Sequence, residues 1–150
     1  NTAYSSLEKL SRGIVIQDGK MAELAEEYIE SLRIKTPDKD QPVKTLSGGN
    51  QQKVVIARIL ATKCDILIFD EPTRGIDVGA KQEIYSLMAS LAEQGKSIIM
   101  ISSEMPELIG MSDRMLVMNN GKIVGELSKE EVTQERILEM ASAEEAGQTI

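Results

Sequence analysis

The 150-residue sequence contains no histidine and no tryptophan, one phenylalanine and one cysteine. A single cysteine excludes an intrachain disulfide and is typical of a reducing compartment. Because aromatic residues are scarce, a core built from the 41% of hydrophobic residues must be aliphatic and rich in methionine. The net charge is −7 and no cluster of lysine and arginine is visible. This excludes a general nucleic-acid-binding protein, because phosphate backbones are bound by clustered cations.

A stretch long enough to cross a bilayer and a signal peptide are both missing, so we expect any link to a membrane to run through a partner. The pattern G-x-x-x-x-G-K-S/T is missing as well. Its loop cradles the β- and γ-phosphates of a nucleotide. We therefore expect this chain by itself to bind a nucleotide weakly or not at all.

Apolar residues recur at helical spacing or in short runs along most of the chain, which predicts alternating helices and strands. The continuous apolar runs at 66–69 and 98–101 predict strands buried on both faces. The other expected elements are helices at 21–32, 78–93 and 105–110, a hairpin of 115–118 and 122–127, and a last helix from Ser128, with Glu131 completing a capping box, to about Ala143. This order predicts an α/β fold with a mainly parallel sheet flanked by helices and an antiparallel hairpin near the C-terminus.

Two adjacent carboxylates, Asp70 and Glu71, follow the first of these strands. Open α/β sheets bind their ligands at the carboxyl ends of the strands. In nucleotide hydrolysis, Asp70 is then expected to hold Mg²⁺ while Glu71 orients and polarises the attacking water. The alternative is that both residues merely begin a turn that Pro72 closes.

A serine-glycine-glycine segment precedes the helix expected at Asn50–Leu60. Ser47 is a good N-cap, and Gly48 and Gly49 would let a phosphate approach the backbone N–H groups at the positive end of the helix. An ordinary capped helix explains the serine but not the two glycines. The expected buried stripe of this helix consists of Val54, Val55, Ile56, Ile59 and Leu60.

Together these motifs resemble those of a known family. LSGGNQQK at 46–53 resembles the ABC signature, ILIFDEP at 66–72 the Walker B strand, and TRGID at 73–77 the D-loop. With PTRGIDVGAK and ISSEMPELIGMSDRMLVM, the region from about Ile34 to Met140 is similar to the carboxy-terminal ATPase half of bacterial monosaccharide importers of the ribose and galactose type.

The resemblance implies a P-loop NTPase-like fold, truncated at its N-terminal side. Residues 1–45 would be a remnant of the helical subdomain and a loop, and 46–150 the carboxy-terminal part of the ATPase core with signature, Walker B, D-loop and a degenerate H-loop. The family places its phosphate loop upstream of all these motifs. The chain is therefore expected to be a fragment of a longer ATPase domain.

The resemblance also implies a function: the ATP-binding and ATP-hydrolysing portion of a sugar importer, coupling hydrolysis to monosaccharide uptake. ATP and Mg²⁺ would be its cofactors. Its partners would be the other ATPase half of the same polypeptide, the sugar permease in the membrane and, indirectly, a sugar-binding protein, with no nucleic acid. It would lie peripherally on the cytoplasmic face of the cell membrane. Ribose, galactose and xylose remain alternatives for the sugar.

Roles for single residues follow from the same resemblance. Ser47, Gly48 and Gly49 would act in trans on ATP held by the partner half. Most ABC ATPases carry a switch histidine where this sequence has Ser103, so the half-site of Asp70 and Glu71 would hydrolyse ATP poorly.

Two further residues keep two interpretations each. Gln51, expected with Gln52 on the exposed side of the signature helix, would hydrogen-bond nucleotide or partner, or be solvated. Asp77 would reach across the dimer interface to the partner's site, or cap the helix that starts at Val78.

Two rival functions differ from transport in what they predict for the sequence. A soluble ABC-type ATPase of DNA repair, chromosome organisation or translation would carry coiled-coil insertions or basic arms, and the sequence has neither. A regulatory or interaction module without catalysis of its own describes the isolated chain but does not compete with transport by the intact protein.

Overall fold

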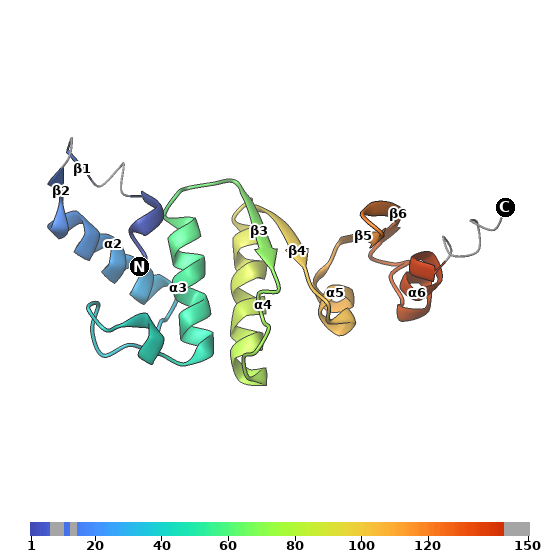
Figure 1. The fold of residues 1–150 in the computed structure, drawn as a ribbon, viewed down its shortest axis with the longest axis horizontal. Helices are drawn as coiled ribbons and strands as arrows, with labels where there is room; N and C mark the ends of the chain where they lie inside the picture. Colours follow the sequence, from blue (N-terminus) through green and yellow to red (C-terminus); the bar gives the residue numbers. More distant parts are fainter. Residues whose placement is uncertain (7–10, 13–14, 143–150) are drawn as a thin grey trace. The chain divides into compact units, whose positions relative to one another are not determined.

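A computed structural model of the chain describes residues 1–6, 11–12 and 15–142 (Figure 1). The chain forms two compact units, Asn1–Ile99 and Met100–Ile150. Within the described residues, three separate two-stranded sheets alternate with helices. None of the helices in this part of the chain combines the length and the apolar composition needed to cross a bilayer. The predicted boundary after residue 45 concerns subdomains of the family rather than compactness, and it stays a prediction.

The first unit begins with the 3₁₀ turn η1 (Tyr4–Ser6), the antiparallel pair β1 (Ser11–Arg12) and β2 (Val15–Ile16), and helix α2 (Asp18–Ser31). Helix α2 starts earlier than the predicted Met21. Asp18 lies in its first turn, where a carboxylate is stabilised by the positive end of the helix dipole. After the helix, Arg33 adopts a φ of 51°, and the N–H of Ile34 donates to the carbonyl of Ile29 at 2.9 Å. The left-handed residue and this hydrogen bond end α2 and change the direction of the chain.

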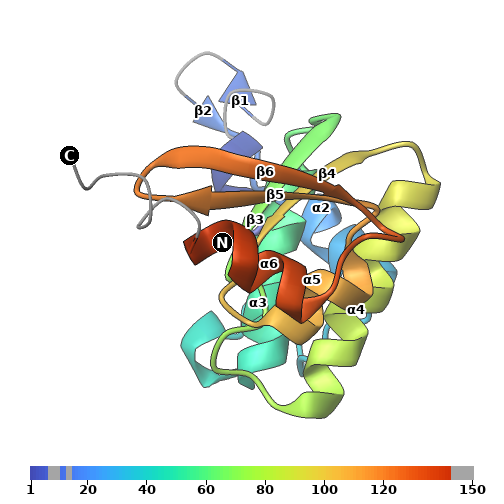
Figure 2. The ribbon, with the colours of Figure 1, turned by 90° about the vertical axis from the view of Figure 1, so that its right-hand side faces the viewer.

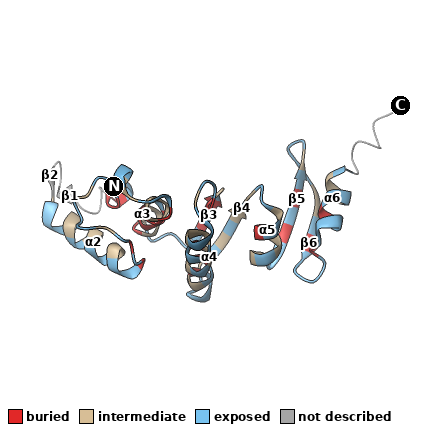
Figure 3. Ribbon diagram, turned by 90° about the horizontal axis from the view of Figure 1, so that it is seen from below, coloured by how far each residue is buried: buried red, intermediate tan, exposed pale blue. Residues whose placement is uncertain are grey.

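A short 3₁₀ turn, η2 (Val43–Thr45), leads into helix α3 (Gly48–Leu60). The helix starts at Gly48 rather than at the predicted Asn50, so both glycines lie in its first turn. Figure 3 shows buried segments within α3. Val54, Ile56 and Ala57 are buried, but Val55 is exposed and the predicted stripe is wrong there. The reason is helical geometry, since 100° per residue carries Val55 to the side opposite the buried face.

Strand β3 (Ile66–Asp70), helix α4 (Val78–Glu93) and strand β4 (Ser97–Ile101) form a β-α-β unit. The two strands pair with each other, and α4 forms the crossover that parallel strands require. The predicted bounds of α4 are confirmed, including its stop near Gly95, which adopts a φ of 87°. The predicted α/β class with an antiparallel hairpin near the C-terminus is confirmed, and among the described residues the predicted parallel sheet is represented by this β-α-β unit.

The prediction that both strands are buried on both faces is wrong. Along β3, Leu67 and Phe69 are buried, whereas Ile66 and Ile68 are 64% and 58% exposed. Strand β4 also alternates, and Ile99 and Ile101 are exposed. Successive side chains of a strand point to opposite faces, and in the described residues only one face of this pair is covered. A continuous apolar run therefore did not indicate two covered faces.

The second unit contains α5 (Met105–Met111), β5 (Arg114–Asn119), β6 (Lys122–Ser128) and α6 (Gln134–Ser142). The two strands form the predicted hairpin, whose turn residues Asn120 and Gly121 have φ values of 48° and 76°. Helix α6 lies along the hairpin (Figure 2). The core of this unit is aliphatic and consists of Met115, Val117, Leu127, Val132 and Ile137.

The last helix begins later than predicted. Glu131 does accept hydrogen bonds from the backbone N–H and the hydroxyl of Ser128, at 3.0 and 2.7 Å, as a capping box requires. That contact closes only a turn, and α6 starts at Gln134 with Thr133 as its cap, since the N–H of Arg136 donates to the Thr133 hydroxyl at 3.2 Å. The predicted end near Ala143 lies outside the described residues.

Candidate functional site

The first turn of α3 carries the serine-glycine-glycine segment. Ser47 occupies the N-cap position, but its side chain does not cap the helix. Instead, the amide of Asn50 donates to the Ser47 hydroxyl at 2.8 Å. The first-turn N–H groups of a helix have no partner within the helix, and their partial positive charge binds anions. This end of α3 therefore has the chemistry of a phosphate-binding site.

Polar side chains at the start of α3 form hydrogen bonds with the backbone of the segment that precedes the helix. The side-chain Oδ1 of Asn50 accepts a hydrogen bond from the backbone N–H of Lys35 at 2.8 Å, and the Gln51 side chain donates to the backbone carbonyl of Leu46 at 2.8 Å. Gln51 and Gln52 are half-buried, so their predicted place on the exposed side of the helix is wrong. The preceding loop lies against the helix at Gln51, whose part-buried side chain bonds to Leu46. A nucleotide contact of Gln51 stays a prediction.

The two glycines also let α3 approach its neighbours closely. A Cβ atom on Gly49 would lie 2.5 Å from the Cβ of Ala80 in the first turn of α4. A Cβ on Gly48 would lie 3.2 Å from the Cγ2 of Ile76, just before α4. The glycines thus have a packing role in addition to the phosphate access expected from the sequence, and they bring the signature segment against the D-loop.

Asp77 is the N-cap of α4, and its Oδ1 accepts the N–H of Ala80 at 2.9 Å. The capping interpretation is therefore confirmed, while a contact across a dimer interface stays a prediction. Ala80 meets both Gly49 and Asp77. A continuous series of contacts consequently joins the start of α3 to the D-loop.

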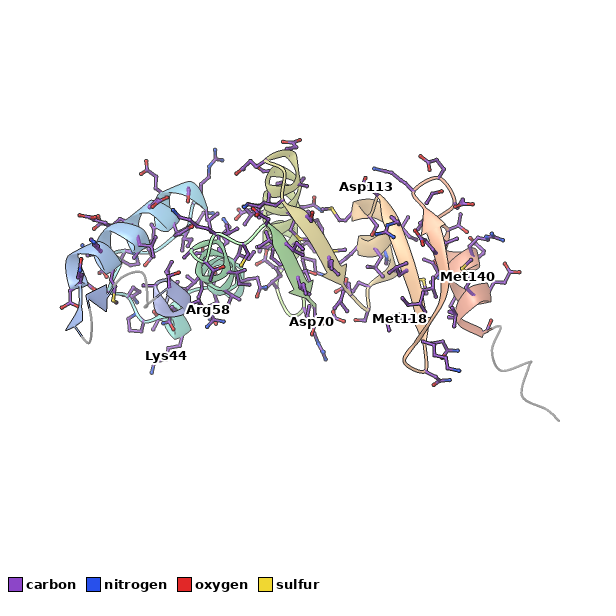
Figure 4. All side chains as sticks on the ribbon, turned by 90° about the horizontal axis from the view of Figure 1, so that it is seen from above. Lys44, Arg58, Asp70, Asp113, Met118 and Met140 are labelled. Atoms are coloured by element: carbon purple, nitrogen blue, oxygen red, sulfur yellow. The ribbon has the colours of Figure 1, made fainter. Side chains whose placement is uncertain are left out.

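Asp70 and Glu71 lie at the carboxyl end of β3, where Asp70 is exposed (Figure 4). Glu71 adopts a φ of 48°, and its carbonyl accepts the N–H of Arg74 at 3.2 Å. The pair therefore also begins a turn, within which Pro72 is buried. Two carboxylates suit Mg²⁺, which is usually held by one or two of them together with substrate phosphates. The described residues contain no cluster of three or more His, Cys, Asp or Glu that would hold a metal ion alone.

Ser103 belongs to the second unit and is exposed between β4 and α5. Its neighbour Ser102 donates from its hydroxyl to Oε2 of Glu107 at 2.9 Å and accepts the N–H of Glu104 at 3.0 Å. Glu107 is buried, so this loop is anchored to the start of α5. Among the predicted site residues, the structure brings together those of the signature and the D-loop.

The sequence interpretation missed a buried lysine. The Lys53 ammonium lies 2.8 Å from Oε2 of Glu83 on α4 and donates to the carbonyl of Arg33 at 3.2 Å. Hydrogen bonding to Lys53 lowers the pKa of Glu83, and nearby Lys35 adds to this while Asp77 opposes it. The sequence did contain a sign that Lys53 is buried, because residues 49, 53, 56 and 57 lie on one side of a helix.

Residues 2–74 match the family model described as "ABC transporter". The chain belongs to the ABC transporter family. The ribose import ATP-binding protein RbsA 1 of Rubrobacter xylanophilus is 56% identical over 144 residues, which cover 95% of this chain and 29% of that protein. The xylose import ATP-binding protein XylG of Photobacterium profundum is 51% identical over 144 residues, covering 96% and 28%. The chain thus spans less than a third of these ABC relatives.

Solved structures agree with this membership. An ATP-binding cassette of an ABC transporter is 27% identical, with a TM-score of 0.70, and the match covers 81% of this chain and 49% of that one. A metal-chelate type ABC transporter in an inward-facing conformation has a TM-score of 0.80 at 18% identity, covering 93% and 55%. The second likeness shows the fold alone. Both matches place the described elements in the fold of ABC ATPases.

Proposed function

We propose that this chain is part of the ATP-binding subunit of a bacterial sugar importer and supplies the signature segment that completes an ATP site in trans. The observation that carries the proposal is the first turn of α3, which the Ser47 side chain leaves uncapped and which is held against the D-loop. Relatives that are more than half identical are named import ATP-binding proteins for ribose and xylose. Their names support import rather than DNA repair or translation.

In this function, the Ser47 hydroxyl and the N–H groups of Gly48 and Gly49 bind the terminal phosphate of an ATP held by the phosphate loop of the other ATPase half. Preorganised donors of this kind stabilise negative charge that develops during phosphoryl transfer. Asp77 carries the D-loop contact to the same partner. Catalysis at that site also needs the partner's own carboxylate pair and histidine.

The carboxylates of this chain serve a second, weaker half-site. Asp70 would hold Mg²⁺, which when bound neutralises charge on the nucleotide's phosphates. Glu71 accepts a hydrogen bond from the attacking water and orients it. Ser103 takes the sequence position of the switch histidine that most ABC ATPases carry, and its hydroxyl is shorter and cannot become cationic. We therefore propose slow hydrolysis here and fast hydrolysis at the site completed by Ser47.

The partners of this function are the other ATPase half of the same polypeptide and the membrane-spanning permease, with a sugar-binding protein acting through the permease. The protein would sit peripherally on the cytoplasmic face of the cell membrane. Ribose, galactose and xylose are the candidate sugars. A catalytically silent module is the alternative that describes this chain when it is separated from its partner half.

The proposal is tested with the full-length protein and its permease in proteoliposomes. ATP hydrolysis is measured with a sugar-binding protein loaded with ribose, galactose or xylose, and with the unloaded protein. We expect one loaded form to stimulate hydrolysis and drive uptake of its radiolabelled sugar. In parallel, ATP binding is compared for this chain and a version extended upstream. Hydrolysis that no sugar stimulates, or equal failure of both chains to bind ATP, contradicts the proposal.

A further inference from the structure

Lys53 is a buried cation with two polar partners. Its side chain is only 7% exposed, whereas the lysines of two other ion pairs, Lys96 and Lys129, are 26% and 60% exposed. A buried ammonium is costly unless it is paired and hydrogen-bonded. Here a carboxylate oxygen of Glu83 and the carbonyl of Arg33 satisfy it. The Lys53 ammonium is therefore held in one position by these two partners, unlike the ammonium of an exposed surface ion pair.

The two partners lie on different elements. Arg33 is the left-handed residue that ends α2, and Glu83 lies in the second turn of α4. Lys53 itself stands one helical turn after Gly49 on the same side of α3. One ammonium group thus ties the signature helix both to the end of α2 and to the helix that follows the D-loop.

Helices α3 and α4 consequently meet at two successive turns. The first meeting is the close approach of Gly49 to Ala80, and the second is the pair of Lys53 and Glu83. A single small contact lets two helices pivot, while a second contact one turn away fixes their rotation and register. Both contacts together therefore set the position of the first turn of α3, which begins with Gly48 after Ser47.

We infer that Lys53 is a positioning residue of the signature segment: its bonds to Glu83 and to the Arg33 carbonyl hold the first turn of α3 in the orientation that the partner's ATP requires. This inference rests on the proposed function. The Lys53 side chain bonds to Glu83 and to the backbone of Arg33, so its role in this inference is positional and not catalytic. It acts through α3 on Ser47, Gly48 and Gly49.

The informative variant is Lys53→Met, which keeps the length of the side chain and removes its charge. Glu83 is 49% exposed and stays solvated without its partner, so no uncompensated buried carboxylate is created. Removing one partner of a buried ion pair is strongly destabilising when the charge left behind is itself buried, which is not the case for Glu83. The fold is therefore expected to persist while the register of α3 relaxes. Lys53→Arg keeps a cationic hydrogen-bond donor at this position, and Lys96→Met removes the pair with the exposed Asp65 as a matched control.

Positioning is read directly by hydrogen exchange in the full-length protein bound to its permease. We expect the amides of residues 51–55 to exchange about tenfold faster in Lys53→Met, and less than about threefold faster in Lys53→Arg and Lys96→Met. Unchanged exchange in Lys53→Met overturns the inference. Where Lys53→Met does not assemble, Glu83→Gln is measured in its place and is expected to change exchange in the same direction.

The functional readout separates positioning from binding. Lys53→Met should lower kcat for ATP hydrolysis about tenfold and leave KM for Mg·ATP within about twofold, because the partner's phosphate loop holds the nucleotide. Lys53→Arg should recover most of kcat. A rise in KM with unchanged kcat, or an arginine variant no better than the methionine variant, overturns the inference. A wild-type complex without ATPase activity contradicts the proposed function instead, and hydrogen exchange then decides the positioning role alone.

Discussion

Gly49 and Ala80 face each other so closely that a Cβ atom on the glycine would lie 2.5 Å from the alanine Cβ. Neither atom can move without its backbone, so the contact leaves no room for adjustment. It places the first turn of the signature helix against the first turn of the helix capped by Asp77. The spacing of signature and D-loop is therefore set by two small residues.

Gly49→Ala should destabilise the intact protein by about 1–3 kcal/mol, because overpacking outweighs the gain in helix propensity of up to about 1 kcal/mol. Gly110→Ala is the matched control, since a Cβ there meets nothing within 4 Å and Gly110 also lies in a helix. Urea unfolding of both variants measures the difference. The double variant Gly49→Ala with Ala80→Gly should regain part of the loss, and equal stability of Gly49→Ala and wild type would show that the contact is looser than described.

Gly48→Asp should reduce ATP hydrolysis by the intact transporter about 100-fold or more, because a carboxylate would occupy the approach of the ATP phosphate. Glu71→Gln should reduce it about tenfold or less, since Glu71 serves the weaker half-site. Steady-state ATPase assays compare them, and Gly19→Asp, where a Cβ meets nothing within 4 Å, controls for added charge. A larger loss in Glu71→Gln would show that the asymmetric assignment is wrong.

Substitutions of Asp77 separate its two roles. Asp77→Ala removes the hydrogen bond to the Ala80 N–H and should cost about 1 kcal/mol of stability. Asp77→Asn keeps a good N-cap, so stability should change little. If Asp77 also contacts the partner's site, the asparagine variant should still lose several-fold in ATPase rate. Thermal unfolding and ATPase assays are run on both variants, and full activity of Asp77→Asn would leave capping as the whole role.

The pair of Lys53 and Glu83 predicts a pH dependence. Lys53 holds the pKa of Glu83 below its ordinary value of 4.5. A lowered folded-state pKa contributes stability that is complete above the unfolded value and is lost as pH falls through the folded value. Wild type should therefore exceed Glu83→Gln in stability at neutral pH, and the difference should shrink below about pH 4.5. Urea unfolding between about pH 3 and about pH 7 checks this. In a Lys53→Met background the same comparison should be nearly flat.

Much of the fold was predictable because its signals are local. Asp77 and Gly95 mark the two ends of α4, and Asn120-Gly121 marks the hairpin turn. Burial of the strands was not predictable, because the apolar run of Ile66 and Ile68 carries no information on what covers each face. The late start of α6 has a similar cause. Ser128 and Glu131 form a capping box, but the next residues close a turn before Thr133 starts the helix.

The candidate site was predictable in its motifs and not in its supports. Ser47, Gly48, Gly49 and Asp77 were recognisable because they lie within contiguous stretches. Contacts between elements were hidden, since partners such as Lys53 and Arg33 lie 20 positions apart, and the motif that ends at Lys53 does not indicate which residue its side chain meets. A lysine within the buried side of α3 was the only trace of this support in the sequence.

At position 71, the backbone turn and the proposed chemistry favour different residues. The turn favours a residue that adopts a left-handed backbone easily, whereas the chemistry requires a carboxylate. A φ of 48° costs a glutamate about 1 kcal/mol or more, and glycine or asparagine would adopt it more easily. A library selected only for heat resistance should drift toward those residues at position 71, whereas one selected for growth on the transported sugar should keep the carboxylate to the extent that this half-site still works. The residue recovered would thus report how degenerate the second ATP site has become.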